Sequence, residues 1–113
     1  RHMVAASIAD AVLAVFDSKY TYQIKRPFML DNSILTIMPT PNHPSYPAGH
    51  STLSAAAATI LAYYFPENAG RWEELMLEAG NGRTWGGIHF PIDNETGFVL
   101  GKRVAKEAIT RLP

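Results

Sequence analysis

Three short polar segments interrupt this otherwise apolar sequence, and each carries side chains suited to binding or attacking a tetrahedral oxyanion. In chain order they contain Lys19 and Arg26, then Gly49 and His50, and finally Arg83, His89 and Asp93. Lysine and arginine supply positive charge, and a helix that begins at a glycine presents unpaired N–H groups to an anion. Histidine exchanges a proton near neutral pH. The combination predicts an oxyanion site with acid–base or nucleophilic chemistry.

The third segment has the residue types of a nucleophilic site. Asp93 follows His89 by four residues, so its carboxylate can hold one imidazole nitrogen and leave the other free to react. Arg83 has a planar guanidinium that suits two-point contact with a phosphate group. A lone histidine and aspartate at this spacing are more often structural. The pair therefore indicates a catalytic site only when it is considered together with the other two segments.

The first two segments are weaker signals when each is considered alone. Pro47-Ala48-Gly49-His50-Ser51 ends a proline-rich stretch and opens an uncharged one, which predicts a helix start with Ser51 as its cap. Lys19 and Arg26 reach one point only if the chain between them curves around it. Solvent exposure is the usual state of single cations of this kind.

Together the three segments match an ordered signature. The chain contains Lys-x6-Arg-Pro from Lys19 to Pro27, Pro-x-Gly-His from Pro47 to His50, and Arg-x5-His-x3-Asp from Arg83 to Asp93. This pattern resembles the type 2 phosphatidic acid phosphatase (PAP2) and vanadium-dependent haloperoxidase superfamily, over about residues 19–101. The sequences around His50 and His89 are most similar to those of soluble bacterial, haloperoxidase-like members.

The resemblance implies a role for each residue of the signature. In a phosphatase of this kind, His89 attacks phosphorus to form a phosphohistidine, Asp93 orients His89, and His50 protonates the leaving oxygen and then activates water, without a metal. The equatorial oxygens are bound by Lys19, Arg26, the Gly49 amide and Arg83. In a haloperoxidase the same pocket holds vanadate through His89, with His50 as the acid–base partner of peroxide. We expect an acid phosphatase-type hydrolase of phosphate esters, with the vanadate-dependent haloperoxidase as the alternative.

Two departures from the family pattern leave a third interpretation open. The family usually has serine where this chain has Ala48, and that hydroxyl bonds the oxyanion; it also usually has serine in place of Gly82. Losing a hydrogen bond to a charged group weakens binding by roughly 1.5–3 kcal/mol. A catalytically weak oxyanion-binding or assembly domain is therefore a second alternative.

Composition argues against several other classes of protein. Ten basic and ten acidic residues give no net field for nucleic acid, and the absence of cysteine removes thiolate metal sites. A metal site built from His43, His50, His89 and Asp93 is disfavoured, because no pair has the H-x-x-x-H spacing and nearby cations repel a metal ion. The expected partners are a phosphate or vanadate oxyanion and a small-molecule substrate.

Hydrophobic periodicity predicts an all-α protein, a compact helical bundle with the site at one end of its central helix. Helices are predicted over about residues 4–18, 51–65, 68–79 and 93–112, and residues 28–46 are predicted to form a packed irregular loop that walls a pocket. Pro27 predicts a boundary after Arg26, and Gly80-Asn81-Gly82 is expected to break or cap the third helix. The central helix, predicted over residues 51–65, is shorter than the ~17–25 residues that span a bilayer.

The chain length suits one domain with a single core. Residues 1–3 look like the remnant of an engineered start, and residues 4–113 are expected to form one PAP2-like helical domain or a fragment of a larger one. With no signal-peptide pattern, we expect a soluble protein, compatible with a periplasmic or secreted location after removal of a signal. A trimmed bundle exposes apolar surface, so we expect a homodimer with a helical interface.

Overall fold

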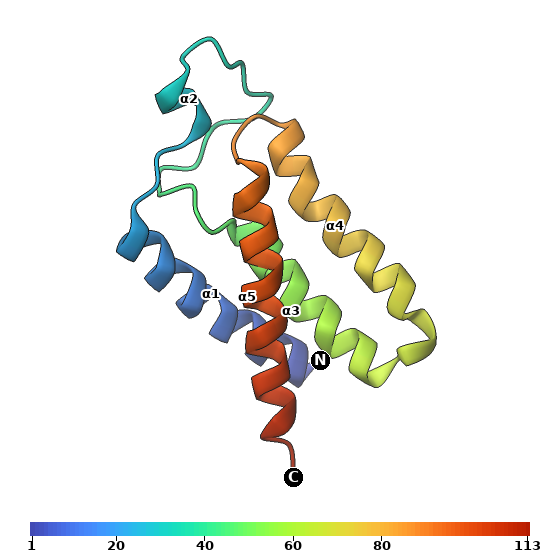
Figure 1. The fold of residues 1–113 in the computed structure, drawn as a ribbon. Coiled ribbons are helices and arrows are strands. Elements are labelled where there is room, and N and C mark those ends of the chain that lie inside the picture. The colour runs from blue at the N-terminus through green and yellow to red at the C-terminus, as the bar shows by residue number, and fades with distance from the viewer.

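The computed structural model describes all residues 1–113 as a set of helices joined by short turns and one long loop (Figure 1). The elements in chain order are α1 (His2–Tyr22), α2 (Pro27–Leu30), α3 (Gly49–Tyr64), the 3-10 turn η1 (Pro66–Asn68), α4 (Ala69–Trp85) and α5 (Pro91–Thr110). No strand is present. The predicted all-α class is therefore confirmed.

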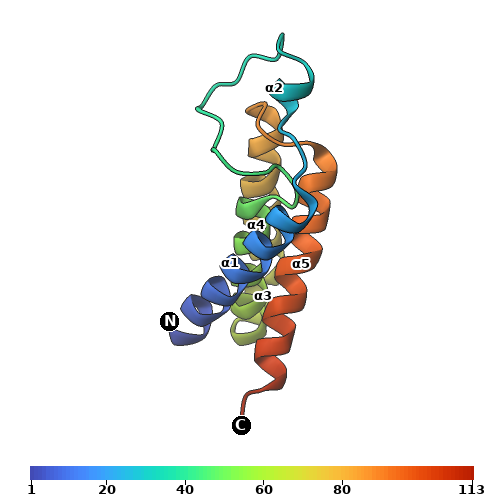
Figure 2. The ribbon, with the colours of Figure 1, turned by 90° about the vertical axis from the view of Figure 1, so that its left-hand side faces the viewer.

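Helix α3 is the centre of the bundle. It packs against α1, α4 and α5, whereas α1 and α4 do not touch each other. Figures 1 and 2 show α1 and α4 on opposite sides of α3, with α5 crossing a third side. The core lies where α1, α3 and α5 meet and consists of Ala11, Ala56, Ile60 and Ala105. Small side chains on α3, among them Ala55 to Ala58, allow this close packing on several sides.

The contact between α3 and α5 is made at the backbone. A side chain at Gly97 would overlap the carbonyl oxygen of Ala48 and the side chain of Ser51. One at Gly101 would overlap the carbonyl oxygen of Thr52. These glycines therefore bring the second and third turns of α5 into direct contact with the first turns of α3. We call Gly97 and Gly101 the glycine seam.

The expected break in the third helix is wrong. Helix α4 continues through Gly80-Asn81-Gly82 and ends at Trp85. Gly80 is buried, and a Cβ there would overlap the ring of Phe98 and lie 2.6 Å from Ser51 Oγ. Gly80 thus serves close helix packing, which offsets the roughly 1 kcal/mol that glycine costs inside a helix. A glycine pattern alone does not distinguish these two uses.

Helix α1 begins at His2 and is longer than predicted, because it continues to Tyr22. Gln23 then ends it in the left-handed region, with φ of 51°, and donates its backbone N–H to the carbonyl of Lys19. The extra turn carries Lys19 to the end of the bundle where α3 begins. The tertiary contacts of Lys19 keep residues 19–22 helical, although their sequence has no clear helical pattern.

The start of α3 also differs from expectation. Its N-cap is Ala48, with no side-chain cap hydrogen bond, and Ser51 Oγ instead donates to Asn94 Oδ1 of α5 at 2.8 Å. The prediction of Ser51 as a cap is therefore wrong. The hydroxyl is used to join α3 to α5.

The long loop is packed in only part of its length. Its first residues form the short helix α2, which the sequence did not predict, and Leu35 and Ile37 are 91% and 82% exposed. Farther along, Pro41 and His43 line a cavity, so this part of the loop does wall a pocket as predicted. None of the helices is both long and apolar enough to cross a bilayer.

Candidate active site

A cavity of about 220 Å³ lies at the end of the bundle where α3 begins. Its walls include four residues of the predicted site, namely Arg26, Gly49, His50 and His89. The remaining walls are His43, Ser54 and apolar side chains of α1, α3 and the loop segments. The loop before α3, the turn before α5 and the end of α1 meet at this end of the molecule (Figure 1).

His89 is buried, and its two nitrogens have different partners. Nδ1 lies 3.0 Å from Oδ2 of Asp93, and Nε2 lies 3.1 Å from Nη1 of Arg26. A carboxylate only accepts hydrogen bonds and a guanidinium only donates them. The neutral ring therefore carries its proton on Nδ1 and a lone pair on Nε2. Nε2 is the nitrogen able to act as a nucleophile.

Asp93 is held by the start of α5 as well as by His89. Pro91 opens this helix, and Asp93 occupies its third position, where Oδ2 accepts the backbone N–H of Phe90 at 2.9 Å. Ser45 Oγ donates to the same oxygen at 2.5 Å. Burial raises the pKa of Asp93, but the hydrogen bonds from His89, Ser45 and Phe90 outweigh it and leave the pKa below its usual value. Asp93 is thus a fixed carboxylate at neutral pH.

The pKa of His89 is also lowered. Burial is the main cause, and the nearby Arg26 and Lys19 charges act in the same direction, while the hydrogen bond to Asp93 opposes them. The net effect favours the neutral imidazole. His89 therefore keeps the Nε2 lone pair at neutral pH.

Arg26 is 1% exposed and is fixed by backbone carbonyl groups. Nε donates to the carbonyl of His43 at 3.0 Å, and Nη1 donates to the carbonyl of Ile88 at 2.8 Å. Nη2 lies 3.2 Å from Nδ1 of His43. The guanidinium therefore spans the loop before α3 and the turn before α5.

Lys19 is fully buried and lies behind the loop. Nζ donates to the carbonyls of Pro44 at 2.7 Å and Ser45 at 3.3 Å. Burial and the charge of Arg26 lower the pKa of Lys19 to about 8, although Asp93 opposes this shift. Neither Lys19 nor Arg26 forms a salt bridge with a carboxylate. Two buried cations thus face one buried carboxylate, which leaves an excess of positive charge.

His50 and Arg83 are held less firmly than the other site residues. His50 lies in the first turn of α3, and burial and the charges of Arg83, His89 and Lys19 lower its pKa. Arg83 Nη1 donates to the thioether sulfur of Met38 at 3.2 Å, and its buried Nε has no partner. Arg83 is close enough for its charge to act on His50, but it does not line the cavity.

The predicted residues are therefore brought together at different depths. Arg26, Gly49, His50 and His89 line the cavity, whereas Asp93 lies behind His89. Lys19 lies behind the loop backbone, with its Cε about 4.0 Å from the position of a Cβ at Gly49. Arg83 lies beside the cavity. The expectation that all the cations line one phosphate-sized space holds for Arg26 alone.

Sequence reasoning did not assign a role in the oxyanion site to two residues that contact it. His43 lines the cavity, and Ser45 bonds Asp93. Both belong to the proline-rich stretch that leads into Gly49 and His50. Polar residues between closely spaced prolines just before a site helix are the signal that could have identified them.

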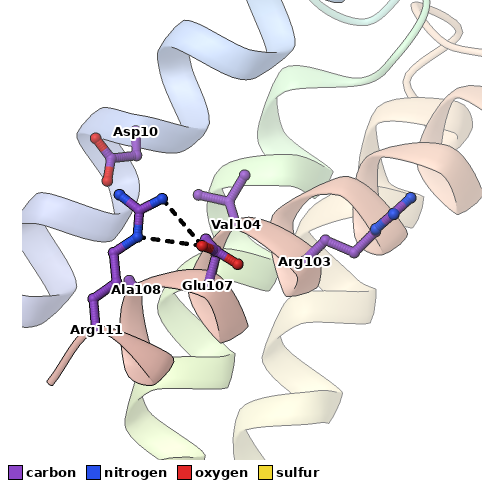
Figure 3. Close-up of a pocket in the computed structure, with 6 residues that line it drawn as sticks. All are labelled: Asp10, Arg103, Val104, Glu107, Ala108 and Arg111. Carbon is purple, nitrogen blue, oxygen red and sulfur yellow. Dashed lines mark hydrogen bonds and ion pairs between the residues drawn. The ribbon is translucent and has the colours of Figure 1, made fainter.

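A larger hollow elsewhere carries no comparable chemistry. It measures about 490 Å³ and is shown in Figure 3. It is lined by Asp10, Arg103, Val104, Glu107, Ala108 and Arg111. Arg111 pairs with Glu107 one turn away on α5 at 3.0 Å, and both side chains are mostly exposed. No group of three His, Asp or Glu side chains in the molecule is arranged to share a metal ion.

The fold and the cavity define a class of α-helical protein that carries a histidine–aspartate dyad beside buried cations. Residues 2–111 match the PAP2 superfamily, and the chain belongs to this superfamily. The bacitracin transport permease protein BcrC of Bacillus licheniformis is 24% identical over 98 residues, which are 87% of this chain and 46% of that protein.

Two solved structures share the fold. A bacterial vanadium-dependent iodoperoxidase superposes with a TM-score of 0.88 and 25% identity, over 98% of this chain and 32% of that one. A transmembrane PAP2-type phosphatidylglycerolphosphate phosphatase from Bacillus subtilis gives a TM-score of 0.68 and 20% identity, over 95% of this chain and 56% of that one. The chain thus spans about half the length of the curated relative and a third to just over half of these structures.

Proposed function

We propose that this chain hydrolyses phosphate esters through a phosphohistidine on His89. The observation that carries the proposal is the state of His89, whose Nδ1 proton is held by Asp93 and whose Nε2 lone pair is at the cavity wall. A nucleophile oriented by a second group in this way is the general arrangement of covalent catalysis. Membership of the PAP2 superfamily supports it.

The phosphoryl group binds where the positive charge is in excess. Arg26 lines the cavity with a fixed guanidinium whose Nη2 contacts only His43 Nδ1 and so keeps one N–H for an oxyanion. Lys19 and Arg83 add positive charge from behind and beside it. The N-terminus of α3 adds the Gly49 amide. Positive charge at fixed positions stabilises the charge on the equatorial oxygens in the transition state.

The reaction proceeds in two halves. Nε2 of His89 attacks phosphorus while the bond to the ester oxygen breaks, and His50 gives that oxygen a proton. His50 then takes a proton from water, which attacks the phosphohistidine and releases phosphate and neutral His89. Asp93 holds Nδ1 throughout and stabilises the positive charge on the ring. General acid–base catalysis of this kind contributes about 10²–10⁴-fold.

A vanadate-dependent haloperoxidase is the second candidate, favoured by the TM-score of 0.88 with the iodoperoxidase. The residues fit vanadate, because Nε2 of His89 carries its lone pair at the cavity wall, where a ligand would replace its contact with Arg26 Nη1, and the surrounding charge is positive. Bound vanadate would supply activation of peroxide for the oxidation of a halide. His89 would hold it, Arg26, Lys19 and Arg83 would balance its charge, and His50 would exchange protons beside it.

Turnover assays on one preparation separate these candidates. The first assay measures hydrolysis of 4-nitrophenyl phosphate with a chelator present, and the second measures iodide oxidation after loading with vanadate and adding peroxide. His89→Ala should abolish the activity that is found. His2→Ala is the matched control, since His2 is an exposed histidine at the opposite end of α1 from Lys19.

Each result selects one function. Hydrolysis with an acid-labile phosphohistidine trapped after rapid quenching supports the phosphatase, and iodide oxidation alone supports the haloperoxidase. If both assays are silent while phosphate still binds, the chain is the oxyanion-binding domain instead. Activity that survives in His89→Ala would overturn the assignment of the nucleophile.

We further propose that the chain forms a homodimer. Along α3 and α4, Ala57, Ala58, Leu61, Trp72 and Leu75 line an apolar hollow of about 210 Å³ that no other helix covers. Apolar surface of this kind is stabilised by a partner. Light scattering across a hundredfold range of protein concentration should report twice the mass of one chain, and a monomer at every concentration would contradict the proposal.

A further inference from the structure

Ser45 has a polar role that the reaction described above does not use. It is fully buried in the loop before α3. Its hydroxyl donates to Oδ2 of Asp93 at 2.5 Å and lies 3.4 Å from Nδ1 of His89. It therefore touches both members of the histidine–aspartate pair but lies outside the cavity lining.

The hydrogen bonds on Asp93 are unevenly distributed. Oδ2 accepts from His89, Ser45 and the Phe90 backbone, whereas Oδ1 is buried without any partner. Ser45 supplies the only side-chain hydrogen bond to this carboxylate besides that of His89. Without it, Oδ2 would keep only the Phe90 amide and His89 itself as partners, so no group other than the Phe90 amide would hold the carboxylate in place against the imidazole.

The backbone of Ser45 is itself fixed by two other segments. Its N–H donates to the carbonyl of Ile24 at 2.9 Å, and its carbonyl accepts from Lys19 Nζ at 3.3 Å. The position of the hydroxyl is therefore set by α1 and by the turn that follows it. Ser45 connects the Lys19 segment to the His89 segment, which lies more than 40 residues farther along the chain.

We propose that Ser45 is a positioning residue for His89, whose hydroxyl fixes Oδ2 of Asp93 against Nδ1 and so directs Nε2 into the cavity. The proposal rests on the proposed role of His89 as the nucleophile. By sharing Oδ2, the hydroxyl also takes up part of the negative charge that would otherwise draw a second proton onto His89. Ser45 thus helps to keep His89 neutral.

The charges around this pair decide the direction of the effect. Those that act on His89 are Lys19 from α1 and Arg26 from the segment after it, which disfavour its protonation. His43 from the loop and His50 from α3 also face His89, and Arg83 from α4 lies beyond His50. Only Asp93 favours protonation of His89. Weakening the hold of Ser45 on Oδ2 therefore raises the pKa of His89.

The test is Ser45→Ala, compared with Ser45→Thr, which keeps the hydroxyl. The pKa of His89 is measured by NMR titration of the ring signals, assigned with His89→Ala. We expect Ser45→Ala to raise this pKa by about one unit, because part of one hydrogen bond to a charged group is lost. The acid limb of kcat/KM for 4-nitrophenyl phosphate should move up by the same amount, and Ser45→Thr should move both back towards the parent.

Ser18→Ala is the matched control. Ser18 is next to Lys19, but its hydroxyl donates within α1 to the carbonyl of Ala14 at 2.9 Å. This variant should leave the pKa of His89 and the acid limb unchanged. If Ser45→Ala does not fold, the proposal is tested on the parent protein by NMR. A Ser45 hydroxyl proton that is hydrogen-bonded to Asp93 should exchange slowly with water and give a resolved downfield signal.

The outcomes separate this proposal from the proposed function. An active Ser45→Ala with the parent's His89 pKa and acid limb overturns the role of Ser45 and leaves the phosphatase in place. A parent with no hydrolysis, whose His89 pKa still rises in Ser45→Ala, overturns the phosphatase and supports the positioning role. If Ser45→Ala does not fold, a fast-exchanging hydroxyl proton in the parent overturns the proposal.

Discussion

The two sides of the cavity are built differently. On the nucleophile side, Arg26, His89 and Asp93 are 1%, 4% and 0% exposed and hold one another through hydrogen bonds of 3.0–3.1 Å. On the acid side, His50 is exposed, and Arg83 donates only to a thioether sulfur. His89, the proposed nucleophile, is therefore positioned before a ligand arrives, while His50, the proposed proton donor, remains free to adjust to it. The fixed side is the one on which the proposed bond to phosphorus would form.

The largest effect should come from disrupting the preorganised side. In Asp93→Asn, the amide cannot act as a carboxylate toward Nδ1, so the tautomer that places the lone pair on Nε2 is no longer favoured. We expect kcat for an aryl phosphate to fall about 10³–10⁴-fold, as in other histidine–carboxylate sites. Glu95→Gln makes the same chemical change at an exposed position of α5 and should leave kcat unchanged. A loss of less than tenfold in Asp93→Asn would contradict the comparison.

Changes on the adaptable side should cost less. We expect His50→Gln to lower kcat about 10²–10³-fold for an alkyl phosphate, and much less for 4-nitrophenyl phosphate, whose leaving group needs little protonation. The parent needs protonated His50, and burial together with the charges of Arg83, His89 and Lys19 holds the pKa of His50 below its usual value. Its kcat/KM should therefore fall as pH rises through a range lower than that of an ordinary histidine, and His50→Gln should lose that dependence. Equal losses for both substrates would show that His50 is not the acid.

Lys19 should produce a smaller, pH-dependent effect on binding. Its pKa is lowered to about 8, so the site loses a positive charge as pH rises past this value. Sulfate is a suitable tetrahedral probe because its charge does not change in this range. Calorimetry at fixed ionic strength should show weaker sulfate binding above pH 8 in the parent and no such step in Lys19→Met.

The same lysine has a predictable effect on stability. Its pKa is 10.5 in the unfolded reference and about 8 in the fold, so between these values the unfolded chain binds more protons. The contribution of Lys19 to the free energy of unfolding therefore rises with pH across this window. Denaturant unfolding should show that the free energy of unfolding rises more with pH in the parent than in Lys19→Met across this window. Parallel pH dependences of the two proteins would contradict the lowered pKa of Lys19.

The smallest expected change is a gain of function. Ala48 is fully buried at the start of α3, where the family usually has serine. Ala48→Ser should tighten phosphate and vanadate binding by up to about tenfold, which corresponds to about 1.4 kcal/mol. The two anions should also compete, because both need the cavity beside His89. A thermal-shift titration measures this, and stabilisation that adds between the two anions would mean that they occupy separate sites.

The sequence predicted the parts of the molecule that local patterns determine. Four helices follow from apolar spacing, and the separation of His89 and Asp93 by one helical turn makes their contact foreseeable. The depth of Lys19 could not be predicted, because its carbonyl partners at Pro44 and Ser45 depend on the path of a loop that is 25 residues away. The roles of His43 and Ser45 were missed for the same reason. Gly80 was misinterpreted because its partner Phe98 lies on another helix.

The glycine seam also sets the spacing of residues within the candidate active site. Gly97 follows Asp93 by one helical turn, and the backbone that it meets, around Ala48 and Ser51, is the turn that carries His50. The distance between His50, the proposed proton donor, and Asp93, which anchors the proposed nucleophile, is therefore set by atoms that cannot repack. Even a methyl group at position 97 would have to push α5 away from α3. The separation of the two halves of the candidate site is thus a property of the main chain, and it is set by glycines that have no chemistry of their own.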